Sequence, residues 1–203
     1  MIRHKVVKQL GFALFIAAAL VPAPAIAQSL TTATYDFIDA VKKSDGNKAI
    51  DLLNQHPSGL VDARDGDGNT ALIIAISRSD ENWTGFLLNK GADPNLKGKG
   101  GDTPLIAAAR VDFLEAAQWL LGLGAKVDED NKMGETPLIV AVQRRDAPLV
   151  KLLLDHGANP DKSDSAAGYS ARDYAARDAR AREILKLIED KKPKSAAVAA
   201  AAK

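Results

Sequence analysis

The chain has 203 residues, with 27 lysines and arginines against 26 aspartates and glutamates and a formal net charge of +1. It contains no cysteine, which excludes a disulfide, a thiol nucleophile and a lipid-modified cysteine. The positive net charge depends on the basic residues near both termini.

The first segment, MIRHKVVKQLGFALFIAAALVPAPAIAQS, has basic residues before position 10, an apolar run over 10–21 and then Ala25-Ile26-Ala27. This order is typical of a secretory signal peptide over residues 1–27, cleaved after Ala27. The run is shorter than the roughly 20 residues of a membrane-spanning helix, which disfavours a permanent anchor. The signal is bacterial in style and has no twin arginine. We therefore expect export by the general route and a periplasmic or secreted protein.

Removal of this segment leaves 24 basic and 26 acidic residues, and removal of the four tail lysines leaves 20 against 26. The remaining body is therefore acidic. An acidic surface repels the phosphate backbone of DNA and RNA. The sequence thus argues against nucleic acid as a partner.

Three segments repeat one order of residue types: GNTALIIAISRSDENWTGFLLNKGADPN, GDTPLIAAARVDFLEAAQWLLGLGAKVDEDN and GETPLIVAVQRRDAPLVKLLLDHGANPD. A spacing of 33 residues separates their threonines and also their closing glycines, which are Thr70, Thr103 and Thr136 and Gly91, Gly124 and Gly157. A fixed period of this length predicts a solenoid in which each unit packs on its neighbours.

Each copy is predicted to form two short antiparallel helices. In the middle copy, Thr103 is a favourable N-cap and Pro104 suits the first helical position. Leu105, Ala108 and Ala109 share one helical face, and the same spacing recurs over 113–121. We expect Gly124 to end the second helix in the left-handed conformation, which costs a residue with a side chain more than it costs glycine.

The order Gly-x-Thr-Pro-Leu, an alanine pair, Leu-Leu and Gly-Ala-Asp/Asn resembles the ankyrin repeat. Degenerate copies flank the three full ones: the upstream copy keeps Leu52-Leu53, and the downstream copy has Ser170 in the threonine place, one residue late. The resemblance implies an all-α repeat solenoid over residues 28–190. It would have about five stacked repeats, each a helix-turn-helix plus a β-turn, with atypical terminal copies that face water.

Two positions depart from the family pattern. The histidine that usually follows Thr-Pro-Leu is replaced by an apolar residue in each full copy, at Ile73, Ile106 and Ile139. The glycine that commonly joins the two helices is replaced by Ser79, Asp112 and Arg145. The first change exchanges a polar contact between repeats for an apolar one, and neither change alters the predicted fold.

Patterns of catalytic and metal sites are incomplete. The segment DARDGDGNT at 62–70 has the acidic spacing of a calcium loop, but Thr70 replaces its turn glycine and Ile76 its bidentate glutamate. We interpret it, like GKGG at 98–101, as a turn between repeats. No Gly-x-Ser-x-Gly motif and no phosphate-binding loop are present, and the histidines lack ligand spacing. The sequence predicts no catalytic residue, no cofactor and no metal site.

An ankyrin-like stack presents a concave groove, formed by the turn tips and the exposed sides of the first helices. The resemblance implies that other proteins bind there. We expect Arg78, Arg110 and Arg144 to form a basic stripe that engages a carboxylate-rich patch of the partner. The predicted partner-binding residues are Asp67, Asn69, Ser77, Arg78, Lys99, Asp102, Arg110, Val111, Lys132, Met133, Glu135, Gln143 and Arg144.

These observations favour a non-catalytic protein–protein interaction module, an adaptor or scaffold, in the periplasm. Its resemblance to exported bacterial ankyrin proteins leaves open a protective partner of an exported oxidative-stress enzyme, and a secreted effector is a further alternative. Binding of a small ligand or metal is disfavoured, because His, Cys and carboxylates do not converge. The segment 191–203, KKPKSAAVAAAAK, is predicted to be a disordered tail, with contact to anionic lipid or cell wall as an alternative.

Overall fold

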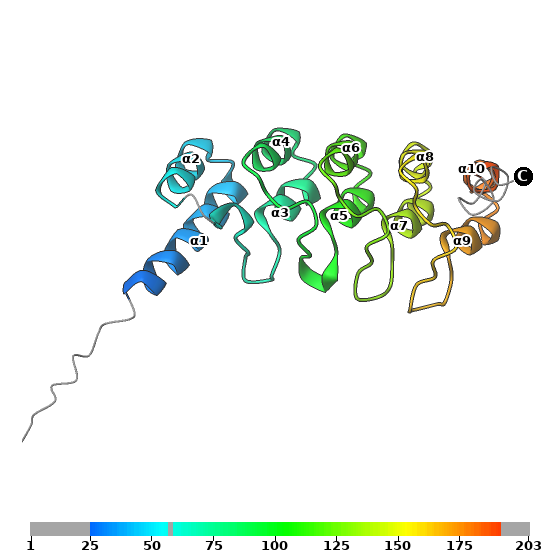
Figure 1. Cartoon of the computed structure of the whole chain (residues 1–203), viewed down its shortest axis with the longest axis horizontal. Coiled ribbons are helices and arrows are strands. Elements are labelled where there is room, and N and C mark those ends of the chain that lie inside the picture. The colour runs from blue at the N-terminus through cyan, green and yellow to red at the C-terminus, as the bar shows by residue number, and fades with distance from the viewer. Residues whose placement is uncertain (1–24, 57–58, 192–203) are drawn as a thin grey trace, which may run out of the picture.

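The computed structural model describes residues 25–56 and 59–191 (Figure 1). Residues 1–24 of the predicted signal peptide and residues 192–203 of the predicted tail therefore lie outside the described residues. The first described helix begins at Ala25, so the expected cleavage after Ala27 falls in its first turn. None of the described helices is long and apolar enough to cross a membrane.

The described residues form ten α-helices in five consecutive pairs and contain no named strand. We number the pairs as repeats 1 to 5. They are α1 (Ala25–Lys43) with α2 (Gly46–Gln55), α3 (Ala71–Ser77) with α4 (Glu81–Asn89), α5 (Pro104–Arg110) with α6 (Leu114–Gly122), α7 (Pro137–Arg144) with α8 (Ala147–Asp155), and α9 (Ala171–Arg177) with α10 (Arg182–Asp190). Two short 3-10 helices, η1 (Leu60–Asp62) and η2 (Lys99–Gly101), lie in the connections.

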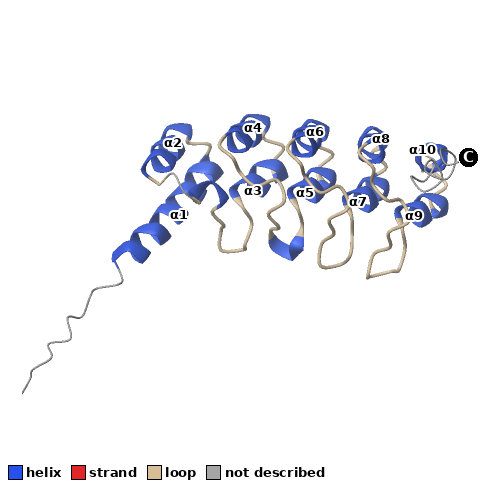
Figure 2. Cartoon of the chain, in the orientation of Figure 1, coloured by secondary structure: helices blue, strands red, loops and turns tan. Residues whose placement is uncertain are grey.

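The pairs stack side by side in chain order, so that the first helices form one row and the second helices another (Figure 1). The long connections between repeats project from the row of first helices, on the side away from the second helices (Figure 2). Repeats 1 and 5 lie at opposite ends of the stack. The predicted all-α repeat solenoid of five units is confirmed.

The recurrent threonines begin the first helices, as predicted. The hydroxyls of Thr70, Thr103 and Thr136 accept hydrogen bonds from backbone N–H groups three residues later, at 3.2, 3.1 and 3.2 Å. Such a bond satisfies a donor that has no partner within the helix. In the degenerate last repeat Ser170 does the same for α9 and forms a reciprocal capping box with Asp173.

Left-handed residues end the helices. Gly91, Gly124 and Gly157 follow the second helices with φ of 85°, 87° and 87°, as the sequence predicts. Ser79, Asp112 and Arg145, which stand where the family commonly has glycine, adopt φ of 52°, 55° and 63°. The conformation is thus retained without the residue that adopts it most easily, at a local cost in backbone energy.

A continuous core runs along the stack from Phe37 of α1 to Ile188 of α10, both fully buried. The isoleucines in the family's histidine position belong to it, with 5% of Ile73 and none of Ile106 or Ile139 exposed. Since every inner repeat packs on two neighbours, the central helices are the most completely covered. Repeat 1 differs in length: α1 has 19 residues, whereas α3 and α5 have seven each.

Candidate protein-binding groove

The turns between repeats hold the tips of the predicted groove. We name each turn after the repeat that follows it: turn 2 (65–69), turn 3 (98–102), turn 4 (131–135) and turn 5 (164–169). In turns 2 and 4 the side chain of the first residue accepts hydrogen bonds from backbone N–H groups of the same turn. Asp65 Oδ1 accepts from the backbone N–H groups of Asp67 and Asn69, both at 3.0 Å, and Asn131 Oδ1 accepts from Met133 at 2.9 Å and Glu135 at 3.0 Å. These bonds are the Asx-type turns that Asp and Asn favour.

Backbone hydrogen bonds also join neighbouring turns. Lys132 N donates to Gly100 O at 3.0 Å, and Ser165 N donates to Met133 O at 2.8 Å. Between turns 2 and 3 the acceptor is a side chain, since Lys99 N donates to Asn69 Oδ1 at 3.0 Å. Turn 3 therefore contacts turn 2 in a different way from the other two junctions.

All thirteen predicted residues lie on this turn-and-helix surface, and none of them is buried. Asp67, Lys99, Lys132 and Met133 are at turn tips, and Asn69, Asp102 and Glu135 directly precede the capping threonines. The other six end the first helices: Ser77 and Arg78 at α3, Arg110 and Val111 at α5, and Gln143 and Arg144 at α7.

The structure brings Asp102, Arg110 and Glu135 together in one network. Arg110 Nε and Nη2 donate to the two carboxylate oxygens of Asp102 at 2.7 and 3.1 Å, and Nη2 also donates to Glu135 Oε2 at 2.8 Å. Asn131, which the sequence analysis missed, donates to both carboxylates from Nδ2 at 2.8 and 2.9 Å. The bonds to Asp102 and then Glu135 raise the pKa of Arg110, although burial opposes them.

The other two arginines of the predicted basic stripe also serve neighbouring repeats. Arg78 Nη1 donates to the carbonyl oxygens of Val41 and Lys42 at the end of α1, at 3.1 and 3.0 Å. Arg144 forms a two-point ion pair with Asp112 of repeat 3. Each guanidinium of the predicted basic stripe thus already has partners inside the stack, and engagement of a partner's carboxylates by this stripe stays a prediction.

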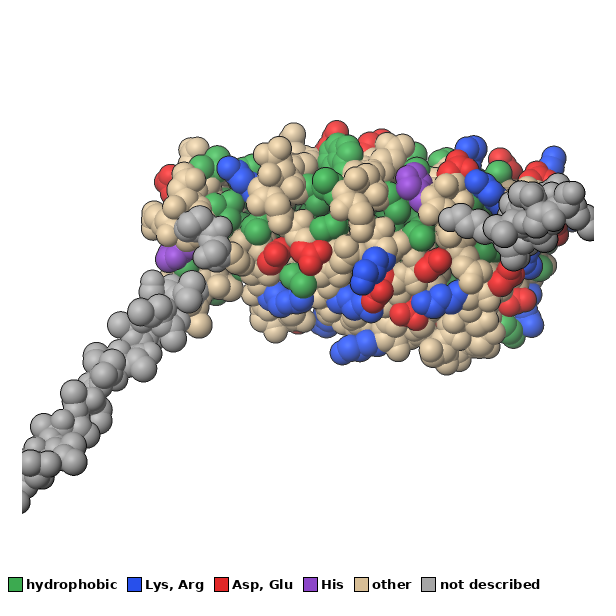
Figure 3. Space-filling view, in the orientation of Figure 1, with side chains coloured by type: hydrophobic (Ala, Val, Ile, Leu, Met, Phe, Trp, Pro, Cys, Tyr) green, Lys and Arg blue, Asp and Glu red, His purple; other side chains and the backbone are tan. Residues whose placement is uncertain are grey.

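The charged side chains at the turn tips are more exposed than these arginines. Lys99 pairs with Asp67 at 3.1 Å, but both side chains are about two-thirds exposed, at 67% and 64%, so the pair contributes little to stability. Lys132 is exposed, and no ion pair to another described residue is found for it. Met133 beside it is 49% exposed. Basic and acidic side chains alternate along the lower half of the face in Figure 3.

A pocket of about 380 Å³ opens between repeats 2 and 3 on this surface. Six of the predicted residues line it, together with two apolar residues that the prediction did not include, Ile73 and Ala107. The six are Asn69, Ser77, Lys99, Asp102, Arg110 and Val111. The pocket combines an apolar floor with a polar rim, which is the composition of surfaces that bind peptides and other ligands.

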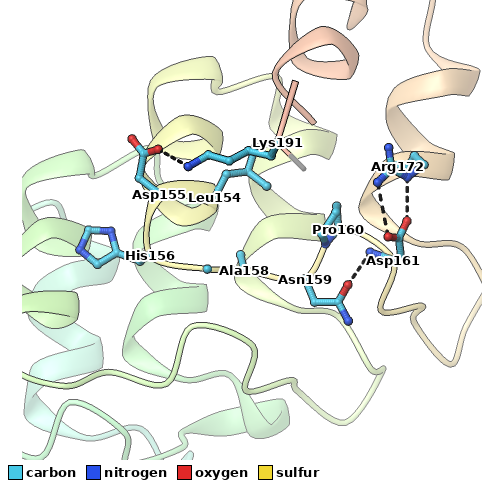
Figure 4. Close-up of a pocket in the computed structure, with 10 residues that line it drawn as sticks. Leu154, Asp155, His156, Ala158, Asn159, Pro160, Asp161, Arg172 and Lys191 are labelled. Carbon is cyan, nitrogen blue, oxygen red and sulfur yellow. Dashed lines mark hydrogen bonds and ion pairs between the residues drawn. The ribbon is translucent and has the colours of Figure 1, made fainter. Parts of the chain in front are cut away.

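A larger pocket of about 460 Å³ lies at the other end of the stack, between the loop after α8 and repeat 5 (Figure 4). Its charged side chains are already paired. Asp155 accepts from Lys191 at 2.6 Å, and Asp161 accepts from Arg172 at 2.7 Å. Lys191 is the first residue of the predicted tail, and this contact joins it to the end of α8.

The groove offers non-covalent recognition. The described residues hold no cluster of three or more His, Cys, Asp or Glu side chains able to bind a metal ion. The polar groups of the groove are arranged as ion pairs and turn hydrogen bonds, and the accessible ones include ammonium, guanidinium, hydroxyl and amide groups and the carboxylate of Asp67. Such groups hydrogen-bond a partner, while the apolar floor provides a surface for desolvation.

Comparison with known proteins agrees with this geometry. The family model described as ankyrin repeats (3 copies) matches residues 37–131 and 112–196. The chain is also similar to a protein of Treponema pallidum (strain Nichols) described as ankyrin repeat-containing, with 34% identity over 105 residues. That match covers 50% of this chain but only 24% of the relative, so it extends to the repeats and not to the whole of the other protein.

Proposed function

We propose, since the chain belongs to the ankyrin repeat family, that it is a non-catalytic adaptor that binds a protein partner in the bacterial periplasm. Members of this family are generally protein–protein interaction modules without enzymatic activity. The groove of turns 2 to 4 and helices α3, α5 and α7 is the binding surface. The observation that carries this proposal is the pocket between repeats 2 and 3, whose apolar floor and polar rim are made largely by groove residues.

The repeats also vary in the way that a binding surface requires. Thr, Ala and Gly recur at fold positions, whereas the turn-tip position holds Asp67, Gly100 and Met133 in successive repeats. Side chains at these positions change the chemistry of the groove without changing the backbone that displays them. Specificity for one partner is therefore expected to depend on these positions.

Periplasmic location is proposed from the N-terminal sequence. Its basic start, short apolar run and Ala25-Ile26-Ala27 are those of a cleaved signal peptide. N-terminal sequencing of protein from the periplasmic fraction tests this part and is expected to begin at Gln28. Recovery of a membrane-bound chain that still begins with Met1 would contradict it.

The binding proposal is tested by affinity capture from a bacterial periplasmic extract, followed by mass spectrometry. Met133→Ala removes an apolar side chain from the groove, and Leu123→Ala is its matched control, because Leu123 is similarly exposed, at 55%, beside the outer helix α6. We expect the captured protein to be depleted by the first change and retained by the second. Equal capture by both variants would place the interface outside the groove.

A further inference from the structure

Three first-helix positions are small where repeats 2 and 3 meet, although the same positions are larger in other repeats. At the 33-residue period, the position of Ser77 holds a long polar side chain in the next two repeats, that of Ala107 holds a branched aliphatic one in both neighbours, and that of Val111 holds arginine in both. The larger residues are Arg110 and Gln143, Ile74 and Val140, and Arg78 and Arg144, respectively.

At two other junctions the larger residue is an arginine that bridges the repeats. Arg78 reaches the end of α1 and bonds its carbonyl oxygens, and Arg144 reaches Asp112 of repeat 3. Val111 takes the place of this bridging arginine at the junction of repeats 2 and 3 and has no group to span it. The pocket of about 380 Å³ opens at this junction and is lined by Ser77, Ala107 and Val111.

The GKGG turn shapes the mouth of the same pocket. A Cβ atom on Gly98 would lie 2.7 Å from Ile73 Cδ1 and 2.9 Å from Asn69 Oδ1, so a larger residue there would displace the ends of these two side chains. Gly100 adds a left-handed residue, with φ of 71°, at a tip position occupied by Asp67 in turn 2 and Met133 in turn 4. Lys99 and its N–H are thereby directed toward Asn69, on the rim of the pocket.

Two exposed ammonium groups and one exposed carboxylate lie around the mouth. Lys99 and Lys132 occupy the same place in successive turns, and Asp67 is the exposed carboxylate that faces Lys99. The groove carboxylates of Asp102 and Glu135 are only 22% and 12% exposed and are bound by Arg110. A partner that approaches this mouth therefore meets an apolar floor bordered by accessible ammonium groups.

We propose that this pocket anchors the partner by a large aliphatic or aromatic side chain whose neighbour in the sequence is Asp or Glu. The apolar side chain rests on Ile73, Ala107 and Val111, and the adjacent carboxylate pairs with Lys99 and Lys132. Ser77 and Asn69 hydrogen-bond the partner's backbone. This inference rests on the proposed groove-binding function and identifies the chemistry of its ligand.

The probe for this proposal is a displayed library of random twelve-residue peptides, selected on the full chain. Individual enriched peptides are then titrated against variants. Ala107→Val with Val111→Arg fills the pocket with residues that repeat 4 carries at the same places, as Val140 and Arg144, so the stack is expected to accommodate them. Leu123→Arg adds the same charge beside the outer helix α6 and is the matched control. If the double variant melts early, Ser77→Gln is used in its place. This substitution copies Gln143 and fills the rim of the pocket from an exposed position.

We expect the enriched peptides to place Leu, Ile, Met or Phe beside Asp or Glu, and the filled variants to bind them at least tenfold more weakly, about 1.4 kcal/mol. Leu123→Arg should leave the affinity unchanged. Lys99→Ala with Lys132→Ala should weaken binding several-fold and reduce its dependence on salt, because rim charges act partly through the rate of encounter.

Three results would overturn the proposal. Peptides whose affinity does not change when the pocket is filled but falls with Met133→Ala would reject the pocket as the anchor. The proposed binding to the groove would then stand. Enriched peptides without an acidic neighbour, or no enriched peptide, would reject the proposed anchor, and capture from the periplasmic extract would then decide the groove function separately. A loss of affinity with Leu123→Arg equal to that of the filled variants would place binding elsewhere and contradict both proposals.

Discussion

Arg144 at the end of α7 donates from Nε to Oδ1 of Asp112 at 2.6 Å and so joins repeat 4 to the helix connection of repeat 3. The hydrogen bond from Arg144 lowers the pKa of Asp112, and burial opposes it only in part. Both side chains are 44% exposed, so the pair belongs to the surface of the groove and is screened by water.

The first prediction follows from this pair. Arg144→Gln should raise the pKa of Asp112 toward the ordinary value of about 3.9, as measured by carboxyl-carbon NMR titration. A carboxyl with a lowered folded-state pKa stabilises the fold above its ordinary pKa, and this contribution is lost as the pH falls through the folded value. The loss of stability caused by Arg144→Gln should therefore be fully present above about pH 4 and should disappear as the pH falls below that value.

Asp155 is the internal control for that titration. Hydrogen bonds from Lys151 and then Lys191 lower its pKa to about 2, and neither lysine contacts Asp112. Its pKa should be unaffected by Arg144→Gln and should rise with Lys151→Gln. A pKa of Asp112 that does not respond to Arg144→Gln would mean that the ion pair does not form in solution.

The second prediction compares two arginines of the groove. Arg110→Ala leaves the carboxylates of Asp102 and Glu135, both mostly covered, without their cation, and should cost about 1–2 kcal/mol of unfolding free energy. Arg144→Ala removes only an exposed pair and should cost less than about 0.5 kcal/mol. Urea denaturation distinguishes them, and equal costs would contradict the network described around Arg110.

The engagement of these arginines within the stack was not predicted from the sequence. Their order along the chain suggested a basic stripe, but it says nothing of the carboxylates that face them from adjacent repeats. A usable signal exists in retrospect, because opposite charges about one period apart meet across the stack: Asp67 with Lys99, Asp112 with Arg144, and Arg145 with Asp178. Arg110 is beyond this rule, since its partners are 8 and 25 residues away.

The third prediction concerns Thr84, which is fully buried in α4 and whose hydroxyl has no hydrogen-bond partner among the described residues. The equivalent positions in repeats 3 and 4 hold Ala117 and Val150, both fully buried. Thr84→Val keeps the shape and removes an unsatisfied polar group, so it should stabilise the protein by about 1 kcal/mol. For a chain of this size the melting temperature should rise by roughly 2–4 °C.

The same substitution at Thr103 is the matched control. Thr103 is equally buried, but its hydroxyl accepts the hydrogen bond that begins α5, at 3.1 Å from Ile106 N. Thr103→Val should therefore destabilise the protein by about 1 kcal/mol. A loss of stability in both variants would show that the hydroxyl of Thr84 has a partner in solution.

The fold was largely predictable because its determinants are local and periodic. The capping threonines and the closing glycines each recur every 33 residues and adopt the expected roles in all three full repeats. Repeat 1 lacks such a threonine, so no residue pattern indicated where its first helix begins. The pocket between repeats 2 and 3 was equally invisible, because it results from three small residues on two different helices.

The fourth prediction tests the backbone hydrogen bonds that join neighbouring turns. Gly134 has φ of 76°, and a Cβ atom there would lie 2.6 Å from the backbone nitrogen of Ser165. Gly124 has φ of 87°, with nothing within 4 Å of its would-be Cβ. Gly124→Ala should cost about 1 kcal/mol for its conformation alone. Gly134→Ala should cost more, because it also separates turn 5 from turn 4, and a cost no larger than that of Gly124→Ala would show that the junction yields easily.

The last prediction uses two serines at the end of α3. Ser79 joins α3 to α4 with φ of 52°, whereas Ser77 lies inside the helix and is exposed. Ser79→Gly removes the cost of holding an ordinary residue in the left-handed conformation, about 1–2 kcal/mol, but makes the unfolded chain more flexible by about 0.4–1 kcal/mol. The balance favours a gain of about 0.5 kcal/mol. Ser77→Gly has only the second effect and should destabilise the protein. The denaturation midpoint should therefore rise for the first variant and fall for the second at unchanged slope, and a fall in both would mean that the side chain of Ser79 supports the turn in a way that its φ does not reveal.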